Sequence, residues 1–192
     1  KGEEEKEIIK ILKKIFDTGA LSPEVKAQAI DSFAAQSIDE QYHESFNLLI
    51  PQLEPIVDSE IALALASYFL DRMVIDQAQK FAQTALKLEE NNNEGLLLLA
   101  SIYYSKENYQ KGLELAELAL ALYPASPMCY VIVAKGHRYL GNLALAEVQI
   151  LAGLDFALAG SNQYRMLHQE GSLIYLELGR DNEAKKWMDK AQ

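Results

Sequence analysis

The chain has 192 residues and a net charge of −10, with 28 Asp and Glu against 18 Lys and Arg. Leu (29) and Ala (24) dominate the composition, whereas the β-branched residues Val (6) and Thr (2) are scarce. This bias toward helix formers excludes a β-sandwich, a barrel or a parallel sheet and predicts an all-α fold. The acidic balance disfavours a nucleic-acid partner or an anionic membrane surface, because such proteins gather Lys and Arg on one face.

The single cysteine and the charged amino end favour a cytoplasmic location. Cys129 has no second cysteine with which to form a disulfide. No run approaches the ~20 apolar residues of a membrane span, and the first residues lack the apolar segment of a signal peptide. Because the sequence begins with Lys1 rather than Met, we expect it to be a piece of a longer chain, from which a signal could have been removed. At the other end, either further repeats were removed or the last repeat meets a partner or a second copy.

Residues 1–58 are expected to form N-terminal helices. The first carries an apolar stripe from Ile8 to Phe16 and stops at Thr18–Gly19. This helix either caps the rest of the helical array or dimerises. A second helix restarts at Ser22–Pro23.

A third helix is expected after the capping box Ser37–Glu40, and the prolines Pro51 and Pro55 then break the chain. The second and third helices either form a degenerate repeat, with Phe33 and Phe46 at its aromatic places, or stand outside the repeat pattern.

Beyond residue 58 a 34-residue pattern recurs. The segment 93–124, numbered from place 1, has characteristic large and small residues at places 4, 7, 8, 11, 20, 24, 27 and 32: Leu96, Leu99, Ala100, Tyr103, Gly112, Ala116, Ala119 and Pro124. A step of 34 residues in either direction finds equivalent residues, and a step of 38 residues finds a fourth copy.

This pattern resembles the tetratricopeptide repeat (TPR), a helix-turn-helix unit of 34 residues. The resemblance implies a right-handed superhelix of four repeats, at about 59–92, 93–126, 127–164 and 165–192, with extra N-terminal helices. Two copies lack Gly at place 15, in the turn within the repeat. The four additional residues before the last copy, around 159–163, predict a longer loop or extended helices.

Residues with catalytic potential are few. His137 and His168 fall at places that pack in the repeat, while His43 lies in a pattern typical of a solvated helix face. Cys129 has no matched histidine or metal-ligand spacing, and no phosphate-binding glycine loop occurs. We therefore expect no catalytic residue, no metal and no cofactor.

The first helix of each repeat is expected to carry a second stripe, at places 5, 9 and 12, that points away from the stacking stripe. In TPR proteins this stripe, with places 2 and 13, lines a concave groove. The resemblance thus predicts a partner-binding groove formed by Leu63, Ser67, Leu70, Leu97, Ser101, Tyr104, Val131, Lys135, Arg138, Tyr139, Gln169, Leu173 and Leu176.

The predicted function is that of a non-catalytic adaptor or chaperone that binds a protein or peptide segment. The segment would supply apolar anchors and an acidic residue facing Lys135 and Arg138, so reversing both charges should weaken binding without unfolding the array. Alternatively, the N-terminal helices cover the groove, and the two basic residues pair with acids such as Glu94 or Glu177.

Two other functions stay open. The chain could be a scaffold subunit that uses its ends and outer faces, including a homodimer through the N-terminal helix or the C-terminal repeat. It could also be the regulatory part of a larger sensor.

Two TPR subfamilies can be compared with the chain. The Lys and Asn clamp of receptors for chaperone tails is absent, because places 5 and 9 hold Leu63, Leu97, Ser67 and Ser101. The segment 126–146 is similar to the central stretch of bacterial type III secretion translocator chaperones, which cradle an extended segment of another protein.

Overall fold

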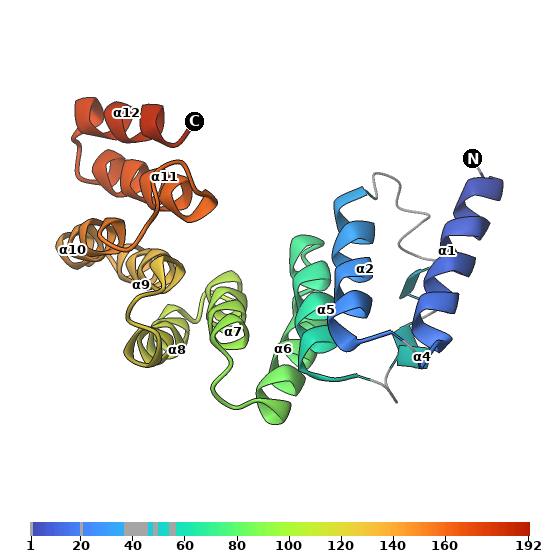
Figure 1. The fold of residues 1–192 in the computed structure, drawn as a ribbon. Helices are drawn as coiled ribbons and strands as arrows, with labels where there is room; N and C mark the ends of the chain where they lie inside the picture. Colours follow the sequence, from blue (N-terminus) through green and yellow to red (C-terminus); the bar gives the residue numbers. More distant parts are fainter. Residues whose placement is uncertain (1, 20, 37–45, 48–49, 54–56) are drawn as a thin grey trace. The chain divides into compact units, whose positions relative to one another are not determined.

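The structure, a computed structural model, describes residues 2–19, 21–36, 46–47, 50–53 and 57–192, and every regular element among them is an α-helix (Figure 1). The chain divides into two compact units, Lys1–Glu90 and Asn91–Gln192. Throughout the described residues, no helix combines the length and the apolar character needed to cross a membrane.

The first unit contains α1 (Gly2–Asp17), α2 (Pro23–Gln36), α4 (Ile50–Leu53), α5 (Ser59–Asp71) and α6 (Ile75–Leu88). The helix α1 ends just before Thr18–Gly19 and α2 begins at Pro23, as expected from the sequence. The capping box Ser37–Glu40 and Pro55 lie outside the described residues. Pro51 is the second residue of α4, and residues 48–49 and 54–56 on either side of this helix also lie outside the described residues.

Aromatic rings form part of the core of the first unit. The ring centroid of Phe46 lies 4.8 Å from that of Phe33 and 4.9 Å from that of Tyr68. All three side chains are buried. Because α2 also packs against α5, an N-terminal helix covers part of the surface of the first repeat helix.

The second unit contains three helix pairs. These are α7 (Asn93–Ser105) with α8 (Tyr109–Leu122), α9 (Pro127–Tyr139) with α10 (Leu143–Leu154), and α11 (Asn162–Glu177) with α12 (Asp181–Lys190). Successive pairs join through contacts of α8 with α9 and of α10 with α11, and also of α9 with α11. Each pair thereby buries a face that it could not bury alone.

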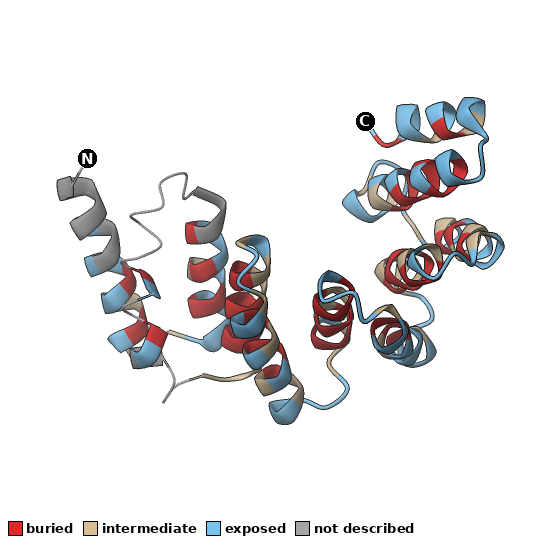
Figure 2. Ribbon diagram, turned by 180° about the vertical axis from the view of Figure 1, so that it is seen from behind, coloured by how far each residue is buried: buried red, intermediate tan, exposed pale blue. Residues whose placement is uncertain are grey.

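The stacking places predicted from the 34-residue pattern are buried on the facing sides of the helices (Figure 2). In the second unit the buried set includes Leu96, Leu99, Ala100, Tyr103, Ala116, Ala119, Val133, Ala134, His137, Ala146, Ile150, His168, Ser172, Tyr175 and Ala184. Pro124 and Met188 are exposed exceptions. Small side chains at these contacts let neighbouring helices approach closely, which explains the abundance of Ala.

The turn inside each helix pair requires one residue in the left-handed conformation. Gly141 and Gly179 adopt it with φ of 76° and 71°. Met73 and Glu107 occupy the equivalent place 15 in the two copies without glycine, and both have φ of 58°. Since this conformation costs about 1–2 kcal/mol for a residue with a Cβ, the packing of the helix pair overrides the local preference at these two turns.

The helix ends follow the expected chemistry. Asp58 caps α5 by accepting a hydrogen bond from the backbone N–H of Ile61 at 2.9 Å, and Pro127 lies in the first turn of α9. Between α10 and α11 the additional residues form a longer connection, since α10 ends at Leu154 and α11 begins at Asn162.

Candidate partner-binding surface

The predicted groove residues lie on α5 in the first unit and on α7, α9 and α11 in the second. Four of them do not line an open surface. Leu63, Leu97, Tyr104 and Val131 are buried, with exposed fractions of 3 to 6%, so the expected exposure of places 5 and 12 is wrong for these side chains.

The physical reason is the number of neighbours around a first helix. The helix α9 contacts α10, α8, α11 and α7, so a stripe at places 4, 7, 8 and 11 is too narrow to cover its packed surface. Ser67 and Leu70 on α5 and Ser101 on α7 are half-buried. The Ser101 hydroxyl donates a hydrogen bond to the Leu97 carbonyl at 2.9 Å within its own helix.

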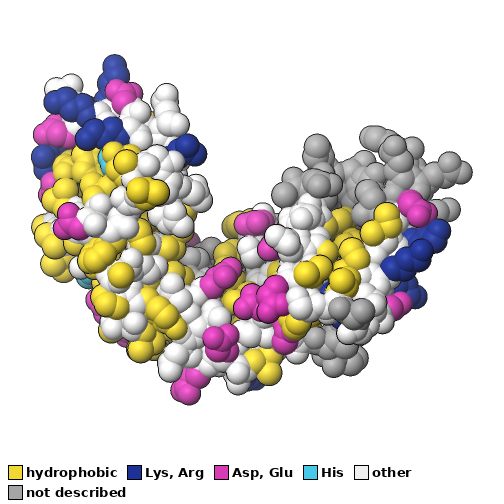
Figure 3. All heavy atoms as spheres, viewed as in Figure 1, with side chains coloured by type: hydrophobic (Ala, Val, Ile, Leu, Met, Phe, Trp, Pro, Cys, Tyr) yellow, Lys and Arg dark blue, Asp and Glu magenta, His cyan; other side chains and the backbone are white. Residues whose placement is uncertain are grey.

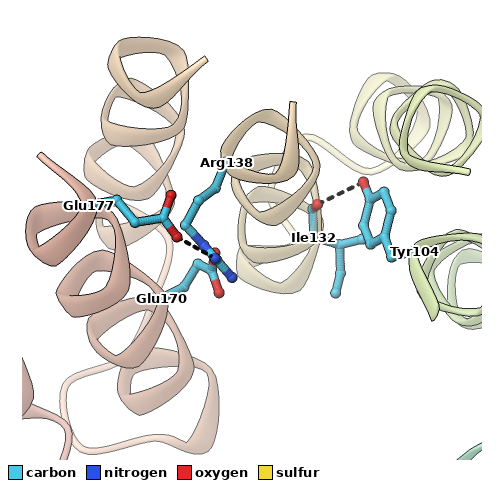
Figure 4. A network of polar contacts seen from close by, with 5 residues as sticks. All are labelled: Tyr104, Ile132, Arg138, Glu170 and Glu177. Carbon is cyan, nitrogen blue, oxygen red and sulfur yellow. Dashed lines mark hydrogen bonds and ion pairs between the residues drawn. The ribbon is translucent and has the colours of Figure 1, made fainter. Parts of the chain in front are cut away.

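Tyr104 reaches from α7 into the packing between helices. Its hydroxyl donates a hydrogen bond to the Ile132 carbonyl at 3.0 Å (Figure 4), and its ring lies against Gly112 and Gly136, where a Cβ atom would collide with it. Burial raises the pKa of the Tyr104 hydroxyl well above its usual range. Tyr104 is therefore a structural side chain rather than an accessible anchor.

Arg138 is held by two carboxylates on α11. Its Nε donates to Glu170 at 2.6 Å and its Nη1 to Glu177 at 2.7 Å (Figure 4). Although burial alone lowers the pKa of the guanidinium, the hydrogen bonds and charges of Glu170 and Glu177 raise it overall. The alternative of pairing with an acid such as Glu177 is therefore what the structure shows for Arg138.

Glu170 was not foreseen from the sequence. Its side chain is only 8% exposed, and a charged residue at such a position in a helix is rarely buried without a partner. The available signal was its spacing from Glu177, because residues seven apart lie on one helix face and can both approach a cation on a neighbouring helix.

Five further residues form what we call the inner strip: the half-buried Lys135 and the exposed Tyr139 on α9, and the exposed Gln169, Leu173 and Leu176 on α11. The α11 residues follow an i, i+4, i+7 spacing and share one face. Leu173 and Leu176 are 40% and 50% exposed, and Tyr139 is 36% exposed. Since α9 packs against α11, one surface of the second unit offers apolar, aromatic and basic groups together.

Neighbouring rings position Tyr139 in this strip. Its ring centroid lies 4.9 Å from that of Tyr109 and 5.5 Å from that of Tyr104. The ammonium of Lys135 lies 5.8 Å from the centre of the Tyr139 ring. Among the described residues, no carboxylate lies within ion-pair distance of Lys135, so its charge differs from that of Arg138 in being unpaired.

Within the described ranges, no three His, Cys, Asp or Glu side chains are grouped in a way that could hold a metal ion. The Cys129 thiol is buried near the Asn93 side-chain oxygen at 3.3 Å, and burial raises the pKa of this thiol.

Because His137 and His168 are buried, we expect the free energy of unfolding to decrease in mild acid. Burial lowers the pKa of both His137 and His168, and the Nδ1 atom of His137 has no hydrogen-bond partner among the described residues. The unfolded chain therefore takes up protons near the ordinary histidine pKa of about 6.5, whereas the folded chain resists them. Stability is full above that pH and falls below it.

We expect the urea midpoint, followed by the fluorescence of the single tryptophan Trp187, to drop between about pH 7.5 and about pH 5.5. His137→Phe should make this drop smaller, because an aromatic ring fills the same place without titrating. A drop as large as that of the unmodified chain would show that His137 does not contribute.

Comparisons with known proteins agree with this architecture. The sequence matches no protein-family model and no curated protein. Among solved structures, it is similar to a thermophilic TPR protein of Thermus thermophilus, TTC0263, with a TM-score of 0.70 and 17% identity over 86% of this chain and 89% of that one.

Two further structures are similar. MamA has a TM-score of 0.60 and 17% identity, over 84% of this chain and 91% of that one. The TPR domain of Sgt2 from Aspergillus fumigatus has a TM-score of 0.57 and 17% identity, over 65% and 81%. The chain therefore has the all-α fold of TPR superhelical proteins, as expected from the repeat. The resemblance to secretion chaperones stays a prediction.

Proposed function

We propose that the chain is a non-catalytic protein-interaction module whose inner strip binds a segment of a partner protein. The observation that carries this proposal is the exposure of Tyr139, Leu173 and Leu176 beside Lys135, whose ammonium forms no ion pair with any residue that the structure describes. Exposed apolar side chains gathered on one surface are typical of binding sites. The TPR fold supports the proposal, since a stacked repeat presents an extended surface for recognition.

The chemistry of the strip defines the kind of segment that fits it. Leu173 and Leu176 would take apolar side chains, and Lys135 would pair with one Asp or Glu of the partner. Arg138 takes no part in recognition, because Glu170 and Glu177 already neutralise it. A change of Lys135 alone is therefore a sharper test than a reversal of both charges. A cytoplasmic location remains part of this proposal.

A peptide selection tests the strip. A displayed library of random peptides, selected on the full chain, should yield binders that share apolar residues and an Asp or Glu. Lys135→Glu should weaken a selected peptide by at least about tenfold, equivalent to about 1.4 kcal/mol, and Leu173→Asp should weaken it at least as much. Fluorescence anisotropy with the synthetic peptide measures both effects.

Lys185→Glu is the matched control, because Lys185 is exposed on α12, outside the strip, and the charge change is identical. Equal affinity of the Lys135→Glu and Lys185→Glu variants would contradict the role of Lys135. If neither Lys135→Glu nor Leu173→Asp changed the affinity of the selected peptides, the binding site would lie elsewhere on the chain.

A further inference from the structure

The outer face of α10 is apolar although it is exposed. Leu145, Val148 and Leu151, at places 19, 22 and 25 of the third repeat, are 50%, 57% and 48% exposed. Ala144 beside them is also exposed. Figure 3 shows hydrophobic side chains gathered over α10 and the neighbouring α11.

The other three repeats carry polar or charged residues at the same places. The equivalents of Leu145, Val148 and Leu151 are Gln77, Lys80 and Gln83 on α6, Lys111, Glu114 and Glu117 on α8, and Glu183, Lys186 and Asp189 on α12. The packing within the repeat therefore does not require apolar residues there. An apolar face that three equivalent helices avoid indicates a surface that is covered by another molecule.

The low net charge of the second unit allows a second copy of this chain to be that molecule. The second unit has eleven Asp and Glu against nine Lys and Arg. Most of the net charge of −10 therefore belongs to the first unit. The charge of the second unit itself therefore opposes the pairing of two second units only weakly.

The two ends of α10 are also complementary to each other. Its first turn has no acidic residue and no side-chain cap, whereas the residue at its C-terminal end is the exposed Asp155. In an antiparallel pair, each Asp155 carboxylate approaches the free N–H groups at the start of the other α10, where the helix dipole is positive. An antiparallel pairing about a two-fold axis closes the assembly as a dimer.

We propose that α10 forms an antiparallel homodimer contact through Leu145, Val148 and Leu151, with Val148 of each copy next to the two-fold axis. This contact uses a surface distinct from the inner strip, and it differs from the N-terminal and C-terminal dimer contacts expected from the sequence.

Sedimentation velocity of the full chain over a range of concentrations tests the contact. The unmodified chain should sediment as a species of twice 21.5 kDa at concentrations where Val148→Glu is monomeric, with the dissociation constant raised at least about tenfold. Gln77→Glu is the control, because it adds the same charge at place 19 on the outer face of α6 and should leave the dimer unchanged.

A charge exchange separates loss of the contact from misfolding. Val148→Glu and Val148→Lys should each be monomeric alone, and their mixture should form a heterodimer, because the two-fold axis brings position 148 of both copies together. Only folded chains can pair in this way. A monomeric unmodified chain at all concentrations, a Val148→Glu variant that dimerises normally, or a mixture that stays monomeric would each overturn the proposal.

Discussion

Gly112→Ala is expected to lower the free energy of unfolding of the second unit by about 2–4 kcal/mol. At an exposed helix position the same change would stabilise the helix by up to about 1 kcal/mol. Here the new Cβ atom would lie 2.9 Å from the Ala100 carbonyl oxygen and would overlap the Tyr104 ring. This carbonyl belongs to the backbone of α7, so relieving the contact would require a shift of the helix itself.

Urea unfolding followed by Trp187 fluorescence measures this loss, since the single tryptophan lies in the second unit. The double variant Gly112→Ala with Tyr104→Leu should show a smaller additional loss than the sum of the two single variants, because the smaller side chain removes the overlap with the ring. Strict additivity would contradict the assigned contact.

Arg138→Ala is expected to destabilise the second unit by about 3–5 kcal/mol, because it leaves the buried carboxylate of Glu170 without its partner. The double variant Arg138→Met with Glu170→Leu should recover much of that loss, since an apolar pair of similar size needs no counter-charge. The same fluorescence measurement applies to both variants.

Arg180→Ala provides the control for this prediction. Arg180 also pairs with two carboxylates, Glu147 at 3.0 Å and Glu183 at 3.1 Å, but its side chain is 43% exposed. Water replaces such contacts readily, so the urea midpoint should change little. A loss for Arg138→Ala no larger than that for Arg180→Ala would contradict the burial argument.

Local sequence signals predict only some of the turns within the repeats. The glycines at 141 and 179 indicate helix ends, and both adopt the left-handed conformation. Met73 and Glu107 carry no such signal, yet they adopt the same conformation at the same place in the repeat. Only the 34-residue period predicts the turns there, because the packed helix pair imposes the backbone geometry.

The inner surface shows where periodicity is insufficient. A helical step of 100° separates places 5, 9 and 12 from the stacking places, but it does not tell how many neighbours a helix has. Tyr104 at place 12 of the second repeat is 4% exposed, whereas Leu176 at the same place of the last repeat is 50% exposed. The helix α9 of the next repeat packs against α7 and covers Tyr104, whereas α11 belongs to the last helix pair of the second unit.

Composition and the repeat together determined the helical class and the spacing of the stacking residues, because each helix pair must bury the same face. Tertiary structure decided which basic residue is available to a partner. Arg138 and Lys135 lie three residues apart on one helix, and the repeat pattern predicts the same role in the groove for both. Glu170 and Glu177 come from a helix more than thirty residues later, and only the packing of α11 on α9 neutralises Arg138. Within the part of the chain that the structure describes, Lys135 gains no such partner.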